Sequence, residues 1–408
     1  MTASEQLAQF AAGSKALPKL CREYKKERAT VHLKELVGGA LSFYAAAAVA
    51  KTGGVHIFVA EDRDAAAYLL NDFYNLLDEK QVYFFPSSYK RSAAYGAEDA
   101  QGVVQRTTAM NAVRGFTKGY LVVCTYPEAL AERVVDAATL QRDTIAVKLG
   151  DKISIAVLED ALADANFTRV DFVYEPGQYS VRGGIVDVFS YSESKPYRID
   201  FFGDEVDSIR RFNISSQLSA DKLDRVEIVP NLNAGEAPRV SFVQFAGSSA
   251  TCWFYDADYV LRRVNDLRRK VLADMEEPGQ IDRLLTSRNV LLRDMAGNSV
   301  MALRDNLPER PATAAVVFDT APQPKFNKNF EMLADDMIRN SLRGYATYIL
   351  SENKVQVERL ENIFHQIGRG QAAVRSLSVT LHEGFVDNDL KLCLYTDHQI
   401  FDRYQRYR

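Results

Sequence analysis

The chain has 408 residues, 47% of them hydrophobic and 25% charged, and its formal net charge is −4. A chain of this length is expected to fold as about two to four domains. The negative charge argues against attraction of the whole molecule to nucleic acid, and no apolar run approaches the roughly 18 residues that a membrane-spanning helix needs.

Targeting and metal-binding signals are missing from the sequence. The first residues have neither the basic start nor the apolar core of a signal peptide, so we expect a cytoplasmic protein without membrane contact. The cysteines lie more than a hundred residues apart, and no histidine lies three or four residues from another histidine or a cysteine. These spacings predict neither a disulfide framework nor a metal site.

Strands and helices alternate in the first part of the chain. Strands are expected over residues 31–36, 55–59, 82–85 and 119–125, and helices over residues 42–50 and 64–77. This β-α-β-α order predicts a parallel sheet that is covered by helices.

A degenerate phosphate-binding loop follows the first expected strand. Such a loop needs a glycine-rich turn, a lysine for the phosphates and a hydroxyl for magnesium. Here Leu41 stands at the lysine position, and Glu35 places a negative charge where the first glycine would approach phosphate. We therefore predict a tight strand-to-helix turn without nucleotide hydrolysis. The positions compared are Glu35, Gly38, Gly39, Ala40, Leu41 and Ser42.

Other catalytic signatures are also missing. No acidic D-E-x-H or D-E-x-D box follows a buried strand, and Ser87-Ser88-Tyr89 lacks a nucleophile elbow. We therefore predict no catalytic residue, no metal ligand and no cofactor site in this chain. Basic and aromatic residues mix over 86–91 and at Tyr95, which fits either a solvated loop or a contact with DNA.

A small α+β module is predicted from about residue 130. A helix is expected over 158–165 and an extended segment over 168–174, followed by a hairpin-rich stretch over 177–212. Within Tyr197–Phe202, polar and apolar residues alternate strictly, so one face of this strand requires a core and the other faces water or a partner.

Charged residues of this module form a candidate protein-binding face. Arg169, Arg182, Arg198 and Asp200 all lie in or beside the extended segments. Several arginines on one sheet edge are typical of a protein interface, because guanidinium groups bind carboxylates bidentately. The same pattern also fits cross-strand ion pairs on a solvated sheet. The sequence pattern leaves both interpretations open.

The rest of the chain alternates strands with helices. We expect strands over 226–229, 240–245, 251–254 and 314–318 and a long charged helix that begins near residue 256. Pro322–Pro324 indicates a linker. After it, helices over 329–340 and 355–366 and strands over 346–351, 376–380 and 390–396 predict a small α/β layer.

Three stretches of the module carry a family resemblance. They are Phe167-Thr-Arg-Val-Asp171, the glycine-rich segment 177–189 and Tyr197-Arg-Ile-Asp-Phe-Phe-Gly-Asp-Glu-Val-Asp-Ser-Ile-Arg210. They resemble the N-terminal region of the bacterial transcription-repair coupling factors (the Mfd family), whose first modules are similar to the excision-repair protein UvrB. The degenerate phosphate loop and the segments 383–386 and 400–408 extend the likeness over nearly the whole chain.

This resemblance implies a fold. A degenerate helicase-like, P-loop NTPase-derived α/β domain with a parallel sheet would comprise residues 1–127 and 214–320. A small α+β module of the UvrA-binding type would interrupt it at residues 128–213. A small α/β domain would follow at residues 325–408.

The resemblance also implies binding residues. The UvrB side chains that face UvrA correspond to Arg169, Arg182, Arg198 and Asp200 in this chain. A further arginine of the UvrB pattern is replaced by Ser180. Residues 86–101 stand where UvrB has a DNA-clamping hairpin but lack its tyrosine-rich pattern, so DNA clamping is not expected.

We therefore predict a non-catalytic segment that recruits UvrA in transcription-coupled nucleotide excision repair at stalled RNA polymerase. The family contacts RNA polymerase and double-stranded DNA, and hydrolyses ATP, through domains that lie beyond this sequence, so we expect a fragment of a larger protein. The alternative is a UvrB-like ATP-dependent DNA-remodelling enzyme, with nucleotide at residues 38–42 and DNA at residues 89–95. A generic interaction domain for another acidic partner is a third option.

Overall fold

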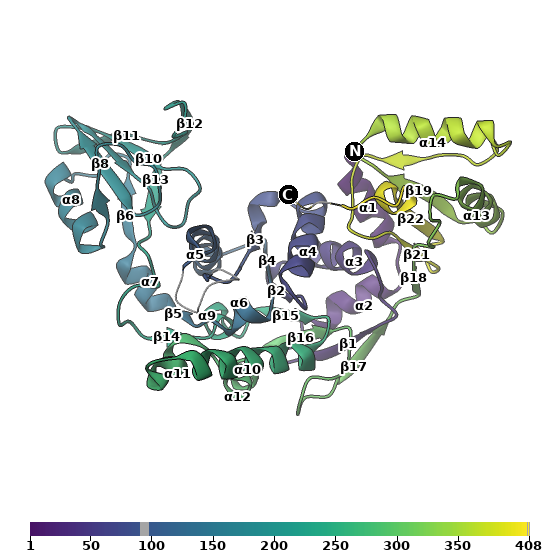
Figure 1. The fold of residues 1–408 in the computed structure, drawn as a ribbon, viewed down its shortest axis with the longest axis horizontal. Coiled ribbons are helices and arrows are strands. Elements are labelled where there is room, and N and C mark those ends of the chain that lie inside the picture. Colours follow the sequence, from purple (N-terminus) through teal and green to yellow (C-terminus); the bar gives the residue numbers. More distant parts are fainter. Residues whose placement is uncertain (90–97, 406, 408) are drawn as a thin grey trace.

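The computed structural model describes residues 1–89, 98–405 and 407 (Figure 1). Of the stretch with mixed basic and aromatic residues, positions 90 and 91 and Tyr95 lie outside the described residues. The ends of that loop are described: Ser88 lies beside Glu132, and its backbone N–H donates to that carboxylate at 3.0 Å.

A seven-stranded parallel sheet forms the centre of the molecule (Figure 1). Its strands lie in the order β17-β1-β16-β15-β2-β4-β3. Most of its strands are buried along nearly their whole length, so their sequences are continuous apolar runs, as expected for a parallel sheet covered on both faces. The bounds are β1 (Thr30–Lys34), β2 (Gly54–Val59), β3 (Val82–Phe84), β4 (Tyr120–Thr125), β15 (Thr251–Phe254), β16 (Ser299–Ala302) and β17 (Ala314–Val317).

Helices cover this sheet and confirm the predicted parallel α/β fold. Side-chain caps start two of them: Asp62 accepts the backbone N–H of Ala65 at 2.8 Å, and Asp256 accepts that of Tyr259 at 3.0 Å. Because β15, β16 and β17 pair beside β1 and β2, segments on either side of the inserted module share one sheet. The main helices are α1 (Ala3–Ala12), α2 (Ala16–Glu23), α3 (Ala40–Thr52), α4 (Arg63–Leu76), α5 (Ala100–Gly115), α10 (Ala257–Asp274) and α12 (Arg288–Asp294).

One predicted strand is wrong. Only β14 (Arg239–Val240) is extended, and the rest of the stretch is helix α9 (Phe242–Ala246). The Ser241 hydroxyl accepts the backbone N–H of Gln244 at 3.1 Å, so this serine caps a helix where the apolar pattern predicted a strand.

The inserted module stands apart from the central sheet, at the left of Figure 1. Its six strands lie in the order β12-β11-β10-β9-β8-β7, and α8 (Ile155–Asp164) packs on one face with Leu158 and Leu162 fully buried. A ribbon of β6 (Ile145–Lys148) and β13 (Arg225–Ile228) joins the module to the rest. The six strands are β7 (Thr168–Arg169), β8 (Gln178–Arg182), β9 (Ile185–Val188), β10 (Tyr197–Phe202), β11 (Glu205–Phe212) and β12 (Ser219–Leu223).

A five-stranded mixed sheet lies on the other side of the central sheet (Figure 1). One set of its side chains forms a separate core with the helices α13 (Phe330–Leu342) and α14 (Lys354–Gln366). A second set joins the core of the central domain: Leu377, Leu381, Phe385, Leu392 and Leu394. The strands, in sheet order, are β18 (Thr320–Pro322), β21 (Phe385–Asp387), β22 (Leu392–Thr396), β19 (Ala346–Leu350) and β20 (Ser376–Leu377).

The predicted linker at Pro322–Pro324 is part of this sheet. Pro322 ends the edge strand β18 and pairs with Phe385 of β21, a position where a proline costs no ladder hydrogen bond. The neighbouring Gln323 is buried, and its side-chain oxygen accepts the backbone N–H of Thr396 at 2.8 Å. Among the described residues, no helix is long and apolar enough to cross a membrane.

Candidate protein-binding face and degenerate nucleotide cleft

The degenerate phosphate loop keeps the shape of a glycine turn. After β1, Glu35 and Gly38 both have a φ of 56°, the left-handed region, and Gly39 precedes the first residue of α3. Leu41, at the position of the missing lysine, is buried in the core, so the side chain that would reach phosphate instead packs inward.

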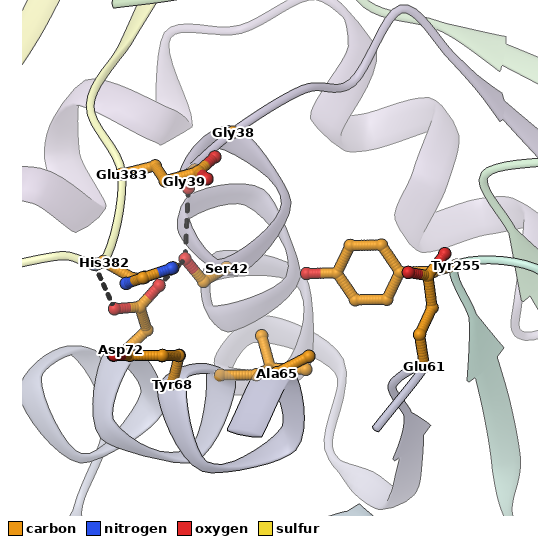
Figure 2. A pocket seen from close by; sticks show the side chains of 11 residues that line it. Gly38, Gly39, Ser42, Glu61, Ala65, Tyr68, Asp72, Tyr255, His382 and Glu383 are labelled. Carbon is orange, nitrogen blue, oxygen red and sulfur yellow. Dashed lines mark hydrogen bonds between the residues drawn. The ribbon is translucent and has the colours of Figure 1, made fainter. Parts of the chain in front are cut away.

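A segment from the C-terminal part of the chain covers this turn (Figure 2). A Cβ atom on Gly39 would lie 2.0 Å from the carbonyl oxygen of Glu383, and one on Gly38 would lie 3.0 Å from that of Gly384. The two glycines therefore allow the main chain at residues 383–384 to pass directly against the turn.

Asp72 of α4 connects the turn to the covering segment. Ser42 Oγ donates to its Oδ2 at 2.8 Å, and the backbone N–H of His382 donates to its Oδ1 at 2.7 Å (Figure 2). Burial raises the pKa of Asp72 from 3.8 to about 7, and the nearby charge of Glu383 contributes to the rise. Tyr68 stacks on the His382 ring with centroids 3.7 Å apart.

The remaining cavity is acidic. Its volume is about 230 Å³, and the described residues that line it include the carboxyl groups of Glu61, Asp72 and Glu383 but no lysine or arginine. Polyphosphate binding depends on cations and on exposed backbone N–H groups at the loop. The described lining of this cavity supplies no cation, and the main chain of residues 383–384 lies against Gly38 and Gly39 where phosphate would approach.

On the module, the strand register forms a polar face opposite α8. Across the sheet, Ser180 of β8 pairs with Asp187 of β9, Asp187 with Arg198 of β10, and Arg198 with Arg210 of β11. The predicted alternation in β10 is confirmed, since Tyr197 and Ile199 lie in the core of the module.

Asp187 holds this face together. Its side chain is 3% exposed and accepts two hydrogen bonds from Arg198, Nε to Oδ1 at 2.7 Å and Nη2 to Oδ2 at 2.9 Å. Arg182 Nη2 donates to the same Oδ2 at 2.7 Å. Arg198 also lies over the Phe212 ring at 4.1 Å and is only 12% exposed, whereas the Arg182 side chain is 37% exposed. Arg198 therefore supports the face, and Arg182 presents itself to solvent.

The other two predicted residues have separate partners. Asp200 accepts hydrogen bonds from Arg210 at 2.7 Å and from Ser208 at 2.6 Å. Arg198 lies on the same polar face of β10 but pairs with Asp187 instead. Arg169 pairs with Glu159 of α8 at 3.0 Å on the opposite side of the sheet. The structure thus brings Arg182, Arg198 and Asp200 onto one face and places Arg169 elsewhere.

Sequence reasoning missed three residues of this face. Asp187 gave no signal, because its partners are recognisable only from the strand register. Phe202, two residues after Asp200 on the same side of β10, is 83% exposed. Phe172 is 51% exposed, and the Arg182 guanidinium lies 4.9 Å from its ring centroid. The alternation in β10 could have identified Phe202 as an exposed apolar side chain.

These features define a class: a helicase-like α/β protein with a degenerate nucleotide cleft and an inserted β-rich module. Residues 145–233 match the family described as the UvrB interaction domain. The chain is thus similar to the N-terminal region of transcription-repair-coupling factors, as the module motifs predicted.

Several transcription-repair-coupling factors are similar in sequence to part of this chain. Over 199 residues the chain is 27% identical to the transcription-repair-coupling factors of Bacillus subtilis and of Escherichia coli. Each alignment covers 48% of this chain and 17% of the relative. Over 101 residues it is 35% identical to the protein of Haemophilus influenzae, which covers 25% of this chain and 9% of the relative. The matched segments therefore span less than a fifth of these relatives.

Replacing Asp187 with alanine should destabilise the module strongly. The change leaves the largely buried guanidinium of Arg198 without its carboxylate, and breaking such a pair costs about 3–5 kcal/mol. Asp207→Ala, at an exposed position of β11, should change stability by about 0.5 kcal/mol or less. The free energy of unfolding of both variants can be measured by urea denaturation, and hydrogen exchange of the module's amides shows whether the loss lies in the module. Equal unfolding free energies for the two variants would contradict the role given to Asp187.

The Asp72 carboxyl should make stability depend on pH. Because its folded pKa is raised above the ordinary 3.8, the folded chain binds a proton more tightly than the unfolded chain. Its contribution is fully present below about pH 4 and is lost as pH rises to about 7, with a slope of at most about 1.4 kcal/mol per pH unit. Asp72→Asn should flatten this slope, and Asp164→Asn, at an exposed position, should retain it. Denaturant unfolding curves recorded from pH 4 to pH 8 measure how the free energy of unfolding depends on pH. The same pH dependence in the unaltered chain, Asp72→Asn and Asp164→Asn would contradict the raised pKa of Asp72.

Proposed function

We propose that this chain recruits UvrA as part of a transcription-repair coupling factor, in transcription-coupled nucleotide excision repair at stalled RNA polymerase. The observation that carries the proposal is the polar face of a UvrB interaction domain, held in one conformation by buried Asp187 and bearing exposed Arg182 and Phe202. Arginine and aromatic side chains are frequent anchors of protein interfaces.

The face is suited to a partner with acidic and apolar groups. Asp187 and Phe172 hold Arg182 from two sides, so binding would cost little of its side-chain entropy. Phe202 adds an apolar side chain that gains nothing by remaining in water. Asp200 and Arg210 neutralise each other and would set orientation more than affinity.

A non-catalytic role for the chain is also part of the proposal. The acidic cavity, buried Leu41 and the main chain of Glu383 against Gly39 support a cleft that binds no nucleotide or other cofactor. ATP-driven movement on double-stranded DNA and contact with RNA polymerase would belong to other parts of the parent protein. The buried, unpaired thiols, such as Cys124 and Cys252, fit a cytoplasmic location. The same cleft gives no support to a UvrB-like DNA-remodelling enzyme.

Phe202→Ala should weaken UvrA binding without unfolding the chain. Because Phe202 is 83% exposed, we expect stability to change by about 0.5 kcal/mol or less and binding to lose about 2 kcal/mol, as for an interface anchor. Val157→Ala, at a 55% exposed position of α8, is the matched control on the opposite side of the sheet. Calorimetric titration against UvrA measures both, and equal affinities would remove the proposed face. No binding by the unaltered chain would remove the proposed function.

A further inference from the structure

An exposed basic face lies on α2 and on the turn that follows it. In residues 15–28 the cations outnumber the acids six to two, although the whole chain has a net charge of −4. α2 belongs to the central domain and lies far from the inserted module (Figure 1). The six cations are all exposed: Lys15, Lys19, Arg22, Lys25, Lys26 and Arg28.

The packing of α2 turns these cations outward. Leu17, Leu20 and Tyr24 recur at helical spacing and are buried, and the Tyr24 hydroxyl donates to a main-chain carbonyl of α3 at 2.5 Å. Lys19 and Arg22 therefore lie on the exposed side of the helix, about 4.5 Å apart along its axis. The basic residues thus form a stripe on the surface rather than a scattered set.

Two of the six cations are paired with acids. Lys26 pairs with Glu23 at 2.8 Å, and Lys15 lies 4.0 Å from Asp389. The remaining acid of the stretch, Glu27, is exposed. Among the described residues, no ion pair or side-chain hydrogen bond holds the other four cations, which we call the basic face: Lys19, Arg22, Lys25 and Arg28.

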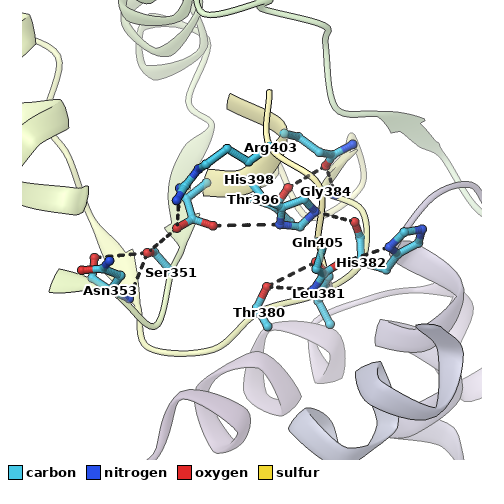
Figure 3. Close-up of polar contacts among 12 residues, drawn as sticks. Ser351, Asn353, Thr380, Leu381, His382, Gly384, Thr396, His398, Arg403 and Gln405 are labelled. Carbon is cyan, nitrogen blue, oxygen red and sulfur yellow. Dashed lines mark hydrogen bonds and ion pairs between the residues drawn. The ribbon is translucent and has the colours of Figure 1, made fainter. Parts of the chain in front are cut away.

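Cations elsewhere in the chain are often held by carboxylates. In the polar hollow between the five-stranded sheet and α4, Arg403 pairs with Asp397 at 3.6 Å, and Ser351 Oγ donates to the same carboxylate at 2.7 Å (Figure 3). The charge of Arg403 is thus balanced within the chain. The charges of the basic face remain available to a partner from outside.

The basic face lacks the apolar anchors of a protein interface. Residues 2–36 expose no large hydrophobic side chain. Protein interfaces are depleted in lysine and depend on aromatic, apolar and well-packed arginine anchors. Contacts with a nucleic-acid backbone need cations that neutralise phosphates, and they require no apolar surface. The composition of the face therefore favours phosphate over an acidic protein.

The face also favours a duplex over a single strand. Single-stranded nucleic acid is bound largely by stacking of its bases on aromatic side chains. Tyr24 is the aromatic residue of this stretch, but it is only 7% exposed and packs against α3. Duplex DNA instead presents one phosphate charge per about 1.7 Å of its axis. The net negative charge of the chain opposes this contact little, because exposed charges are screened beyond about 8 Å at physiological ionic strength.

We propose that the basic face of α2 contacts the phosphate backbone of double-stranded DNA. Its four cations neutralise phosphates and read no base sequence. The contact is weak and depends on salt. It is independent of UvrA binding, because the basic face and the polar face of the module lie on different domains.

Binding of labelled DNA to the full 408-residue chain tests the face. Fluorescence anisotropy would follow a duplex of about 30 base pairs and a single strand of the same sequence. Each phosphate contact contributes about −0.9 to the slope of log affinity against log salt concentration, so four contacts predict a slope of about −3.6. The affinity for the duplex should then fall on the order of 100-fold between about 50 and 200 mM salt. The single strand should bind less tightly.

Variants connect this binding to α2. Replacing Lys19, Arg22 and Lys25 together with glutamine should weaken duplex binding at least about tenfold at low salt and make the slope shallower by about 2.7. Circular dichroism would check that the variant is folded. A matched control removes the same charge at exposed positions on other surfaces and should bind as the unaltered chain does: Lys270→Gln, Lys325→Gln and Lys354→Gln.

Several results would overturn the proposal. They are no duplex binding at low salt, an unchanged salt slope in the α2 variant, and an equal loss of affinity in the control. Tighter binding of the single strand, or of a polyglutamate peptide, than of the duplex would also overturn it. The α2 variant should bind UvrA as the unaltered chain does, so a failure of this proposal is distinguishable from a failure of UvrA recruitment.

Discussion

The buried carboxylate of Asp187 is the interaction on which the proposed binding face depends. It lies in the middle of a six-stranded sheet, 3% exposed, and receives two guanidinium groups from neighbouring strands. A buried charge is costly unless it is fully paired. The side chains of Arg182 and Arg198 are therefore held in their positions beside Asp187. The hydrophobic core under α8 fixes one side of the sheet, and Asp187 fixes the other. Arg182 and Phe202 are therefore presented in a defined geometry.

The central domain retains the backbone shape of a nucleotide-binding fold, but protein main chain lies where phosphate would bind. The glycine turn after β1 persists because the main chain at Glu383 passes against Gly39, where any side chain would collide. Asp72 then holds the covering segment through the His382 backbone. A turn that serves phosphate in related folds here packs against a distant part of the same chain.

Local pattern was sufficient for much of the fold. Continuous apolar runs such as β2 and β4 identified the parallel sheet, and alternation in β10 separated its core face from its polar face. Helix α9 was missed because the Ser241 cap outweighs an apolar pattern that also fits a strand. The N-terminal helices α1 and α2 were not predicted, although α1 begins with a capping box at Thr2.

The site was less predictable because its contacts are long-range. The hydrogen bond from the His382 backbone N–H to Asp72 joins residues 310 positions apart, and no local sequence pattern predicts it. The sequence pattern indicated Arg182, Arg198 and Asp200 as a group, and the structure places these three on one face. The separation of Arg169 from them required the strand register.

Hydrogen exchange of this chain with and without UvrA would show whether UvrA binds to the polar face of the module. We expect slower exchange on β8, β10 and β11, centred on the hairpin that carries Phe202, with little change at β6 or α8. Protection confined to the five-stranded sheet or to the cleft at Gly38–Gly39, with none on the polar face of the module, would contradict it.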